Sequence, residues 1–131
     1  MKSDSIRIAN CSGFYGDKLS VARDMIEGGP IDVLTGDYLA ELTMTILYNQ
    51  RLKRGEQHGY VGTFLKQFRD IAKLAQEKNI KIVTNAGGLN PSSMAESVKE
   101  IIDELNLDLK VAHIEGCLLY TSDAADDIGR V

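Results

Sequence analysis

The chain lacks the cysteine spacing, the long apolar runs and the basic runs that define disulfide-rich, membrane and nucleic-acid-binding proteins. Its two cysteines, Cys11 and Cys117, follow no disulfide or metal-binding spacing, which is typical of a reducing compartment, so we expect a cytoplasmic protein. No apolar run approaches the roughly 20 residues that a membrane-spanning helix needs, and residues 1–10 lack the apolar block of a signal peptide. The chain has no basic run, and its net charge is -4. We therefore expect neither nucleic acid nor a membrane as its partner.

Standard catalytic and cofactor motifs are also missing. The segment Gly13-Phe14-Tyr15-Gly16 lacks the leading glycine of the dinucleotide-binding fingerprint, and no acidic residue follows at the expected strand end. There is no phosphate-binding Gly-Lys-Ser/Thr loop, no zinc-ligand spacing and no nucleophile elbow. The sequence thus predicts no metal and identifies no cofactor.

The sequence does contain a regular alternation of strand-like and helix-like segments. With 44% apolar and 26% charged residues, its composition is typical of a globular domain. Short apolar runs predict strands at residues 6–9, 31–34, 80–84 and 109–114. Helical spacing predicts a helix before 28, two further helices at about 38–53 and 60–78, and a fourth that begins at 91.

Strands that alternate with helices pair in parallel through right-handed crossovers. We therefore expect an α/β fold with a mostly parallel sheet and helices on both faces, which is a doubly wound, Rossmann-like and incomplete domain. The start of an α/β barrel is the alternative, because both folds begin with the same repeating unit.

The helical spacing also predicts which side chains enter the core. In chain order they are Leu19, Ala22, Met25 and Ile26; Leu39, Leu42, Ile46 and Leu47; Val61, Phe64, Phe68, Ile71 and Ala75; and Met94, Val98, Ile101 and Leu105.

Polar residues follow each predicted strand. Parallel strands end at one edge of the sheet, where α/β proteins bind their ligands, so we expect a small-molecule site there. The polar candidates are Asn10, Cys11 and Ser12 after the first strand, Thr35 and Asp37 after the second, Asn85 and Asn90 after the third, and Glu115 after the fourth; Gly13, Gly16, Gly36, Gly87, Gly88 and Gly116 lie among them.

Two acidic residues invite a chemical interpretation. Asp37 follows a glycine at a strand end, where it could act as a general base or bind a hydroxyl group, or could simply cap the next helix. Glu41 lies one turn further on and could reach the same edge, or could lie on a solvated helix face.

The segment TNAGGLNP, residues 84–91, contains two adjacent glycines after a strand. Its backbone N–H groups could hold a phosphate, carboxylate or thioester oxygen, or the glycines could serve a turn that needs a positive φ angle. Asn90-Pro91 is typical of a helix cap followed by a first-turn proline.

Cys11 has two interpretations. Its position at a strand end is compatible with a nucleophile. The alternative is a small buried thiol, because neither His58 nor His113 is placed in the sequence to activate it.

Four stretches together carry a family resemblance. They are IANCSGFYGD (residues 8–17), GGPIDVLTGDYLAELTM (28–44), KIVTNAGGLNP (81–91) and LKVAHIEG (109–116). In this order and spacing they resemble the N-terminal region of the acyclic terpene utilisation (AtuA-type) protein family. The resemblance implies a bacterial cytoplasmic protein of acyclic terpenoid catabolism, as of citronellol and geraniol, with a coenzyme A thioester as substrate.

The family carries no assigned reaction, so the resemblance nominates positions rather than established roles. The nominated catalytic residues are Asp37, Asn85 and Asn10. The nominated ligand-binding residues are Ser12, Gly13, Thr35, Gly36, Glu41, Gly87, Gly88, Asn90 and Glu115.

The last 15 residues, CLLYTSDAADDIGRV, resemble the translation of a sequencing-library adapter. We expect residues 1–116 to be the N-terminal part of the domain and residues 117–131 to be a non-native tail. The alternative is a genuine, slightly acidic C-terminal segment. A domain interrupted there should leave part of a sheet face or edge uncovered, and should associate.

Two functions fit these observations. The first is an enzyme that acts on terpenoid or branched acyl-CoA intermediates, as a hydratase, lyase or transferase. The second is a non-catalytic metabolite-binding or assembly subunit of the same pathway. For the protein itself we expect either a second copy of the chain or another enzyme of the pathway as a partner.

Overall fold

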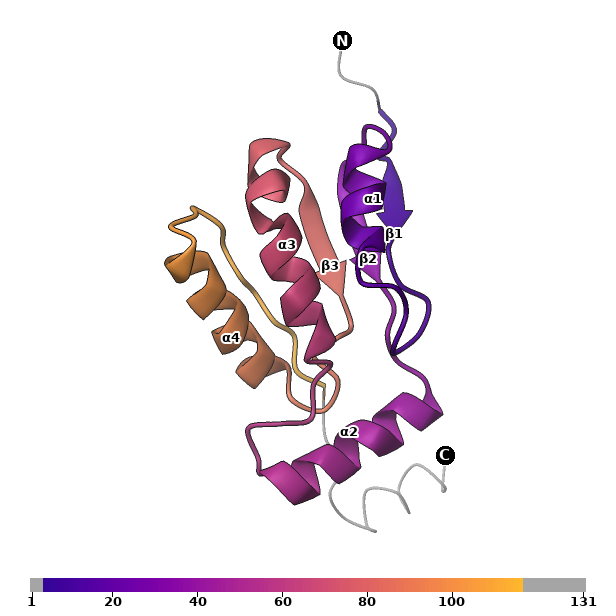
Figure 1. The fold of residues 1–131 in the computed structure, drawn as a ribbon, viewed down its shortest axis with the longest axis vertical. Coiled ribbons are helices and arrows are strands. Elements are labelled where there is room, and N and C mark those ends of the chain that lie inside the picture. Colours follow the sequence, from indigo (N-terminus) through magenta and orange to yellow (C-terminus); the bar gives the residue numbers. More distant parts are fainter. Residues whose placement is uncertain (1–3, 117–131) are drawn as a thin grey trace.

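The computed structural model describes residues 4–116, which fold into an open three-stranded sheet with four helices (Figure 1). The strands are β1 (Ile8–Asn10), β2 (Val33–Gly36) and β3 (Lys81–Thr84), and the helices are α1 (Val21–Glu27), α2 (Glu41–Arg54), α3 (Thr63–Glu77) and α4 (Pro91–Glu104). All strands are parallel in the order β1-β2-β3. The predicted α/β class is confirmed, and the open sheet fits an incomplete Rossmann-like fold rather than a barrel.

One face of the sheet is covered by α1 and α3 (Figure 1). Side chains alternate along a strand, so Leu34, which is fully buried in the centre of β2, points toward this face. It packs in one cluster with Ile26 of α1 and Ile71 of α3. These contacts anchor the three strands, and so fix where the loops that follow them lie.

The other face of the sheet is exposed. Ile8 and Val83, on the two outer strands, are 65% and 59% exposed. The second helical layer of a doubly wound fold is therefore not formed by residues 4–116. This leaves an apolar sheet surface in contact with solvent, as expected for an uncovered face.

The core prediction is confirmed for most positions and wrong for four. The confirmed buried residues are Ala22, Ile26, Leu47, Val61, Phe64, Phe68, Ile71, Ala75, Met94, Val98 and Ile101, while Leu19, Met25, Leu42 and Leu105 are exposed and Leu39 and Ile46 are half-buried. Leu19 lies before α1 and Leu105 lies after α4, because both helices are shorter than the apolar spacing suggested.

Helix α2 lies beyond the C-terminal ends of the strands rather than against a sheet face (Figure 1). It packs through Thr43 and Leu47, and Leu42 on its outer side is 71% exposed. It begins at Glu41 rather than near Tyr38, because the preceding Ala40 is extended (φ -155°, ψ 171°). The stretch before α2 is thereby left at the strand ends.

The predicted fourth strand, at residues 109–114, is wrong. This segment has no regular secondary structure. The chain leaves α4 through Asn106 (φ 55°), and the N–H groups that follow donate within the helical layer: Leu107 to the Ile102 carbonyl at 3.0 Å and Asp108 to Gln76 Oε1 at 2.7 Å. Leu109 then packs against the core between α3 and α4 instead of pairing with β3.

Candidate functional site

The loops after the three strands meet at one edge of the sheet, as the parallel topology predicts. Backbone hydrogen bonds join them: Cys11 N–H donates to the Thr35 carbonyl at 2.8 Å, and Asp37 N–H donates to the Ser12 carbonyl at 3.0 Å. The third loop is joined by the Asn85 N–H, 3.4 Å from the Gly36 carbonyl. We call residues 10–13, 35–38 and 84–90 the strand-end rim.

Asn10 and Thr35 interact on the exposed side of the rim. The Thr35 hydroxyl lies 3.1 Å from Asn10 Oδ1, and Asn10 Nδ2 donates to the Ser12 carbonyl at 2.8 Å. The buried Ser12 hydroxyl donates to the Phe14 carbonyl at 3.1 Å, within its own loop. Asn10 and Thr35 thus present a fixed pair of polar groups, whereas the Ser12 side chain stabilises the loop.

The shortest side-chain hydrogen bond between two residues of the rim joins Asp37 and Asn85. Asn85 Nδ2 donates to Asp37 Oδ1 at 2.7 Å, and Asn85 Oδ1 accepts the Tyr38 backbone N–H at 2.9 Å. Asp37 does not cap α2, whose N-cap residue is Ala40, so the simple capping interpretation is not what the structure shows. The exposed carboxylate is instead oriented by an amide from the neighbouring loop.

The two glycines after Asn85 allow close packing. Gly88 has a φ angle of 55°, and its N–H donates to the Asn85 carbonyl at 3.1 Å. A Cβ atom on Gly88 would lie 2.6 Å from Leu47 Cδ1, and one on Gly87 would lie 2.9 Å from Pro91 Cα. The turn interpretation therefore accounts for Gly88, whose N–H is already paired within the turn.

Asn90 is the N-cap of α4, as its position before Pro91 predicts. Its Oδ1 accepts the Ser93 N–H at 3.3 Å, and its Nδ2 donates to the carbonyls of Glu56 and His58 at 2.6 and 3.2 Å. The side chain thus holds the start of α4 against the loop between α2 and α3.

The other candidates differ in their places. Gly36 lies under the Tyr38 ring, where an added Cβ would approach Cε2 to 2.6 Å, and the Gly13 N–H donates to Asp17 Oδ2 at 3.1 Å. Glu41 is exposed at the start of α2. Glu115 is exposed on the segment that does not form a strand, with His113 Nε2 3.6 Å away. In residues 4–116, neither acidic side chain is hydrogen-bonded to the Asp37–Asn85 pair.

The sequence did not point to two buried residues, Tyr38 of the rim and Gln67 of α3. The Tyr38 hydroxyl donates to Gln67 Oε1, and Gln67 Nε2 donates to the Leu19 carbonyl at 3.2 Å. The sulfur of Cys11 lies 4.0 Å from the Tyr38 hydroxyl oxygen. The available signal was Gln67 itself, a polar residue three positions after Phe64 in the apolar stripe of α3.

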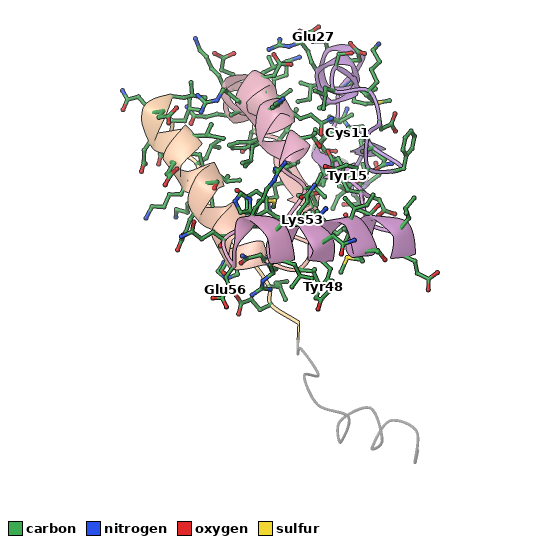
Figure 2. The ribbon with its side chains drawn as sticks, turned by 60° about the horizontal axis from the view of Figure 1, so that its bottom comes forward. Cys11, Tyr15, Glu27, Tyr48, Lys53 and Glu56 are labelled. Carbon is green, nitrogen blue, oxygen red and sulfur yellow. The ribbon has the colours of Figure 1, made fainter. Side chains whose placement is uncertain are left out.

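Burial governs the ionisation of this group. It raises the pKa of the Cys11 thiol, and burial followed by the proximity of Cys11 raises the pKa of the Tyr38 hydroxyl well above its usual range. Both groups are therefore neutral near pH 7. The structure favours the buried-thiol interpretation of Cys11 over the nucleophile, and Cys11 lies inside the molecule (Figure 2).

Two surface hollows lie away from the rim. One, of about 440 Å³, lies beside Arg7, Asp32 and Lys78, at the opposite edge of the sheet. The other, of about 550 Å³, lies between α3 and α4, where Arg69 forms an ion pair with Glu104 at 2.8 Å.

Within residues 4–116, no three His, Cys, Asp or Glu side chains are grouped to hold a metal ion. The described helices are all too short or too polar to cross a bilayer.

Comparison with known proteins identifies a family. No curated protein and no solved structure matches the chain. One family model does match, that of the acyclic terpene utilisation family protein AtuA, over residues 6–127. The match extends into the segment 117–131, for which an adapter origin is predicted and which lies outside the described residues. Because the match covers nearly the whole sequence, the chain belongs to the acyclic terpene utilisation family AtuA.

Proposed function

We propose that the strand-end rim binds the carboxyl or thioester end of an acyclic terpenoid intermediate and takes part in its breakdown. Family membership supports a role in acyclic terpene utilisation. The finer proposal is a branched acyl-CoA substrate and a hydratase, lyase or transferase reaction. Hydration and elimination next to a thioester carbonyl both require a positioned group that moves a proton, and a carboxylate can do so.

The single observation that carries the proposal is the 2.7 Å hydrogen bond between Asn85 Nδ2 and Asp37 Oδ1. In the described part of the chain, the other hydrogen bond to this carboxylate, from the Leu39 N–H at 3.4 Å, also reaches Oδ1. Oδ1 is therefore held, whereas Oδ2 of this exposed carboxylate accepts no hydrogen bond from the described residues and is left for a substrate, as a general acid or base requires.

The roles follow from these positions. Asp37 transfers the proton, Asn85 orients Asp37, and Asn10 anchors a polar group of the substrate. The proposed binding surface around them comprises Gly13, Thr35 and Glu41, while Ser12, Gly36, Gly87, Gly88 and Asn90 shape the loops that carry it. Glu115, whose predicted strand is not formed, is not assigned to it.

Calorimetric titration with coenzyme A thioesters of branched acyclic acids tests the proposal, on this chain and on a longer member of the family with the same residues. Turnover is then measured with each thioester that binds. Asp37→Asn keeps the shape of the side chain and removes its basicity, so we expect this turnover to fall by at least about 100-fold. Asn85→Ala should lower turnover through loss of orientation. Asp103→Asn, an exposed carboxylate change on α4, is the control. Failure to bind any member of a broad thioester panel would count against the proposal.

The second candidate is a non-catalytic metabolite-binding or assembly subunit. It is favoured because both polar groups of Asn85 and of Asn90 are bonded within the chain. These side chains then stabilise the loops rather than contact a reacting group. In that case Asp37→Asn and Asn85→Ala should abolish complex formation and leave no turnover to lose. Co-purification from the native host separates the two, since turnover by the isolated protein excludes this candidate.

A further inference from the structure

We propose that Gln67 is a positioning residue that holds Tyr38 from inside the molecule and thereby fixes Asp37 at the strand-end rim. The inference rests on the proposed function only where it concerns the ligand that Asp37 contacts. The positioning itself follows from contacts within the chain.

Gln67 joins three parts of the structure. It lies on α3 and is 3% exposed. Its Oε1 accepts from the Tyr38 hydroxyl in the loop after β2, and its Nε2 donates to the carbonyl of Leu19 in the loop after β1. Buried amides are retained where both of their polar groups are paired, and this one pairs with two different loops.

Tyr38 is held at both ends. Its hydroxyl donates to Gln67, its backbone N–H donates to Asn85 Oδ1 at 2.9 Å, and its ring packs directly on Gly36. Asp37 immediately precedes Tyr38 and accepts from the same Asn85 side chain. A shift of Tyr38 therefore moves the Asp37 backbone and breaks the geometry that orients its carboxylate.

Cys11 provides a reporter of this arrangement that does not depend on any ligand. Cys11 is 4% exposed, and its sulfur lies 4.0 Å from the Tyr38 hydroxyl oxygen. Alkylation requires both access to the sulfur and the thiolate form. Displacement of Tyr38 removes one of the contacts that cover this sulfur, so we expect it to raise the rate of Cys11 alkylation.

The first experiment measures alkylation of the full chain by iodoacetamide, with peptide mass spectrometry to separate Cys11 from Cys117. In Gln67→Met the Tyr38 hydroxyl loses its acceptor, so we expect the rate at Cys11 to rise by about tenfold. Tyr38→Phe leaves Gln67 Oε1 unpaired and also removes the hydroxyl whose hydrogen bond lowers the pKa of Cys11, so its labelling is compared per thiolate, from the pH dependence of the rate, and that value should also rise. The double variant removes both partners, so its rate should lie below the product of the two single effects.

Gln76→Met is the matched control. Gln76 also lies on α3 and accepts a backbone N–H, from Asp108 at 2.7 Å, but in the segment after α4. Its loss should leave Cys11 labelling unchanged. An unchanged rate in both Gln67→Met and Tyr38→Phe, or single effects that multiply fully in the double variant, would overturn the proposal. Tyr38→Phe retains the test if Gln67→Met does not fold.

A pH profile tests whether the side chain at position 67 must pair with both loops. In Gln67→Glu the protonated carboxyl group can accept from Tyr38 and donate to Leu19, whereas the ionised form cannot donate and is costly when buried. We expect the alkylation rate of this variant, divided by that of the parent at each pH, to rise as the pH increases from 5 to 8. A flat ratio would contradict the assignment.

Thioester titration then separates this inference from the proposed function. We expect Gln67→Met to weaken binding of the branched acyl-CoA panel by about tenfold. If labelling responds and the parent binds no thioester, the positioning role stands and the proposed ligand fails. If the parent binds a thioester and labelling does not respond, the positioning role fails alone.

Discussion

At the scale of single residues, the turn after β3 depends on Gly88. Its positive φ angle is one that residues with a Cβ rarely adopt, and its neighbours leave no room for that atom. Gly88 brings the loop against Leu47 of α2 and so sets the distance between α2 and the strand-end rim. Gly88 thus matters because its lack of a Cβ lets Leu47 and the Gly59 carbonyl pack directly against the turn.

We expect Gly88→Ala to destabilise the domain by about 2–4 kcal/mol, from the left-handed backbone together with overpacking against Leu47 and the Gly59 carbonyl. Urea unfolding followed by circular dichroism measures this. Gly29→Ala is the control, because an added Cβ there has no neighbour within 4 Å. Equal midpoints for the two variants would show that the turn relaxes freely.

The sequence predicts which residues reach the rim better than it predicts the bonds between them. Asp37 and Asn85 are 48 positions apart, and they meet because parallel strands end at one edge. Their hydrogen bond depends on side-chain rotamers, which periodicity does not describe. Gln67 was missed because a glutamine only interrupts the apolar pattern of α3. Its role depends on the hydrogen bond from the Tyr38 hydroxyl, which the pattern does not describe.

At the scale of elements, the starts of β1 and β2 are joined by one ion pair. The Arg7 backbone N–H, Nε and Nη2 donate to the Asp32 carboxylate at 2.8, 3.1 and 3.2 Å. These hydrogen bonds, with the charge of Arg7, lower the pKa of Asp32. The pair therefore connects the first two strands at the edge opposite the rim.

The lowered pKa fixes the sign of a pH effect. The folded state favours the ionised Asp32, so this contribution to stability is present above the ordinary pKa of 3.8 and is lost as the pH falls through the lowered value. We expect the difference in urea midpoint between the parent and Asp32→Asn to be small, constant above about pH 5 and smaller below about pH 4. A difference that grows on acidification would contradict the assignment.

Helices and strands were predictable where the spacing of apolar side chains alone determines the secondary structure. The α3 stripe from Phe64 to Ala75 is buried as its spacing predicts. The run at 109–114 is equally apolar, but a strand also needs backbone partners, and those are set by where the chain leaves α4. Hydrogen bonds from Leu107 and Asp108 tie the start of this segment to α4 and α3, and residues 110–116 are exposed, which no local pattern could reveal.

At the scale of the whole molecule, the described residues form a sheet with one covered and one uncovered face. Ile8 and Val83 lie on the uncovered face, while Leu34 lies beneath α1 and α3. Apolar sheet surfaces of this kind associate in water. The class of fold followed from the alternation of strands and helices, whereas the covering of one face alone follows from the position of α2 beyond the strand ends.

We expect the chain to self-associate at concentrations of tens of micromolar, which sedimentation velocity would detect. Ile8→Lys combined with Val83→Lys should reduce the association and leave the helical circular dichroism unchanged, because charges protect exposed sheet surfaces. Ile114→Lys, which changes an exposed apolar residue outside the sheet, is the control. A monomeric parent with a cooperative melt would contradict this expectation.

The three backbone hydrogen bonds that join the rim loops have an evolutionary consequence. The main chains of Cys11, Asp37 and Asn85 hold the loops together through groups that every residue type except proline possesses. The side chains of Asp37 and Asn85 can therefore be exchanged over generations while these backbone bonds remain, whereas Gly36 and Gly88 leave no room for a larger residue. Relatives could in this way acquire new substrates while they keep the same architecture.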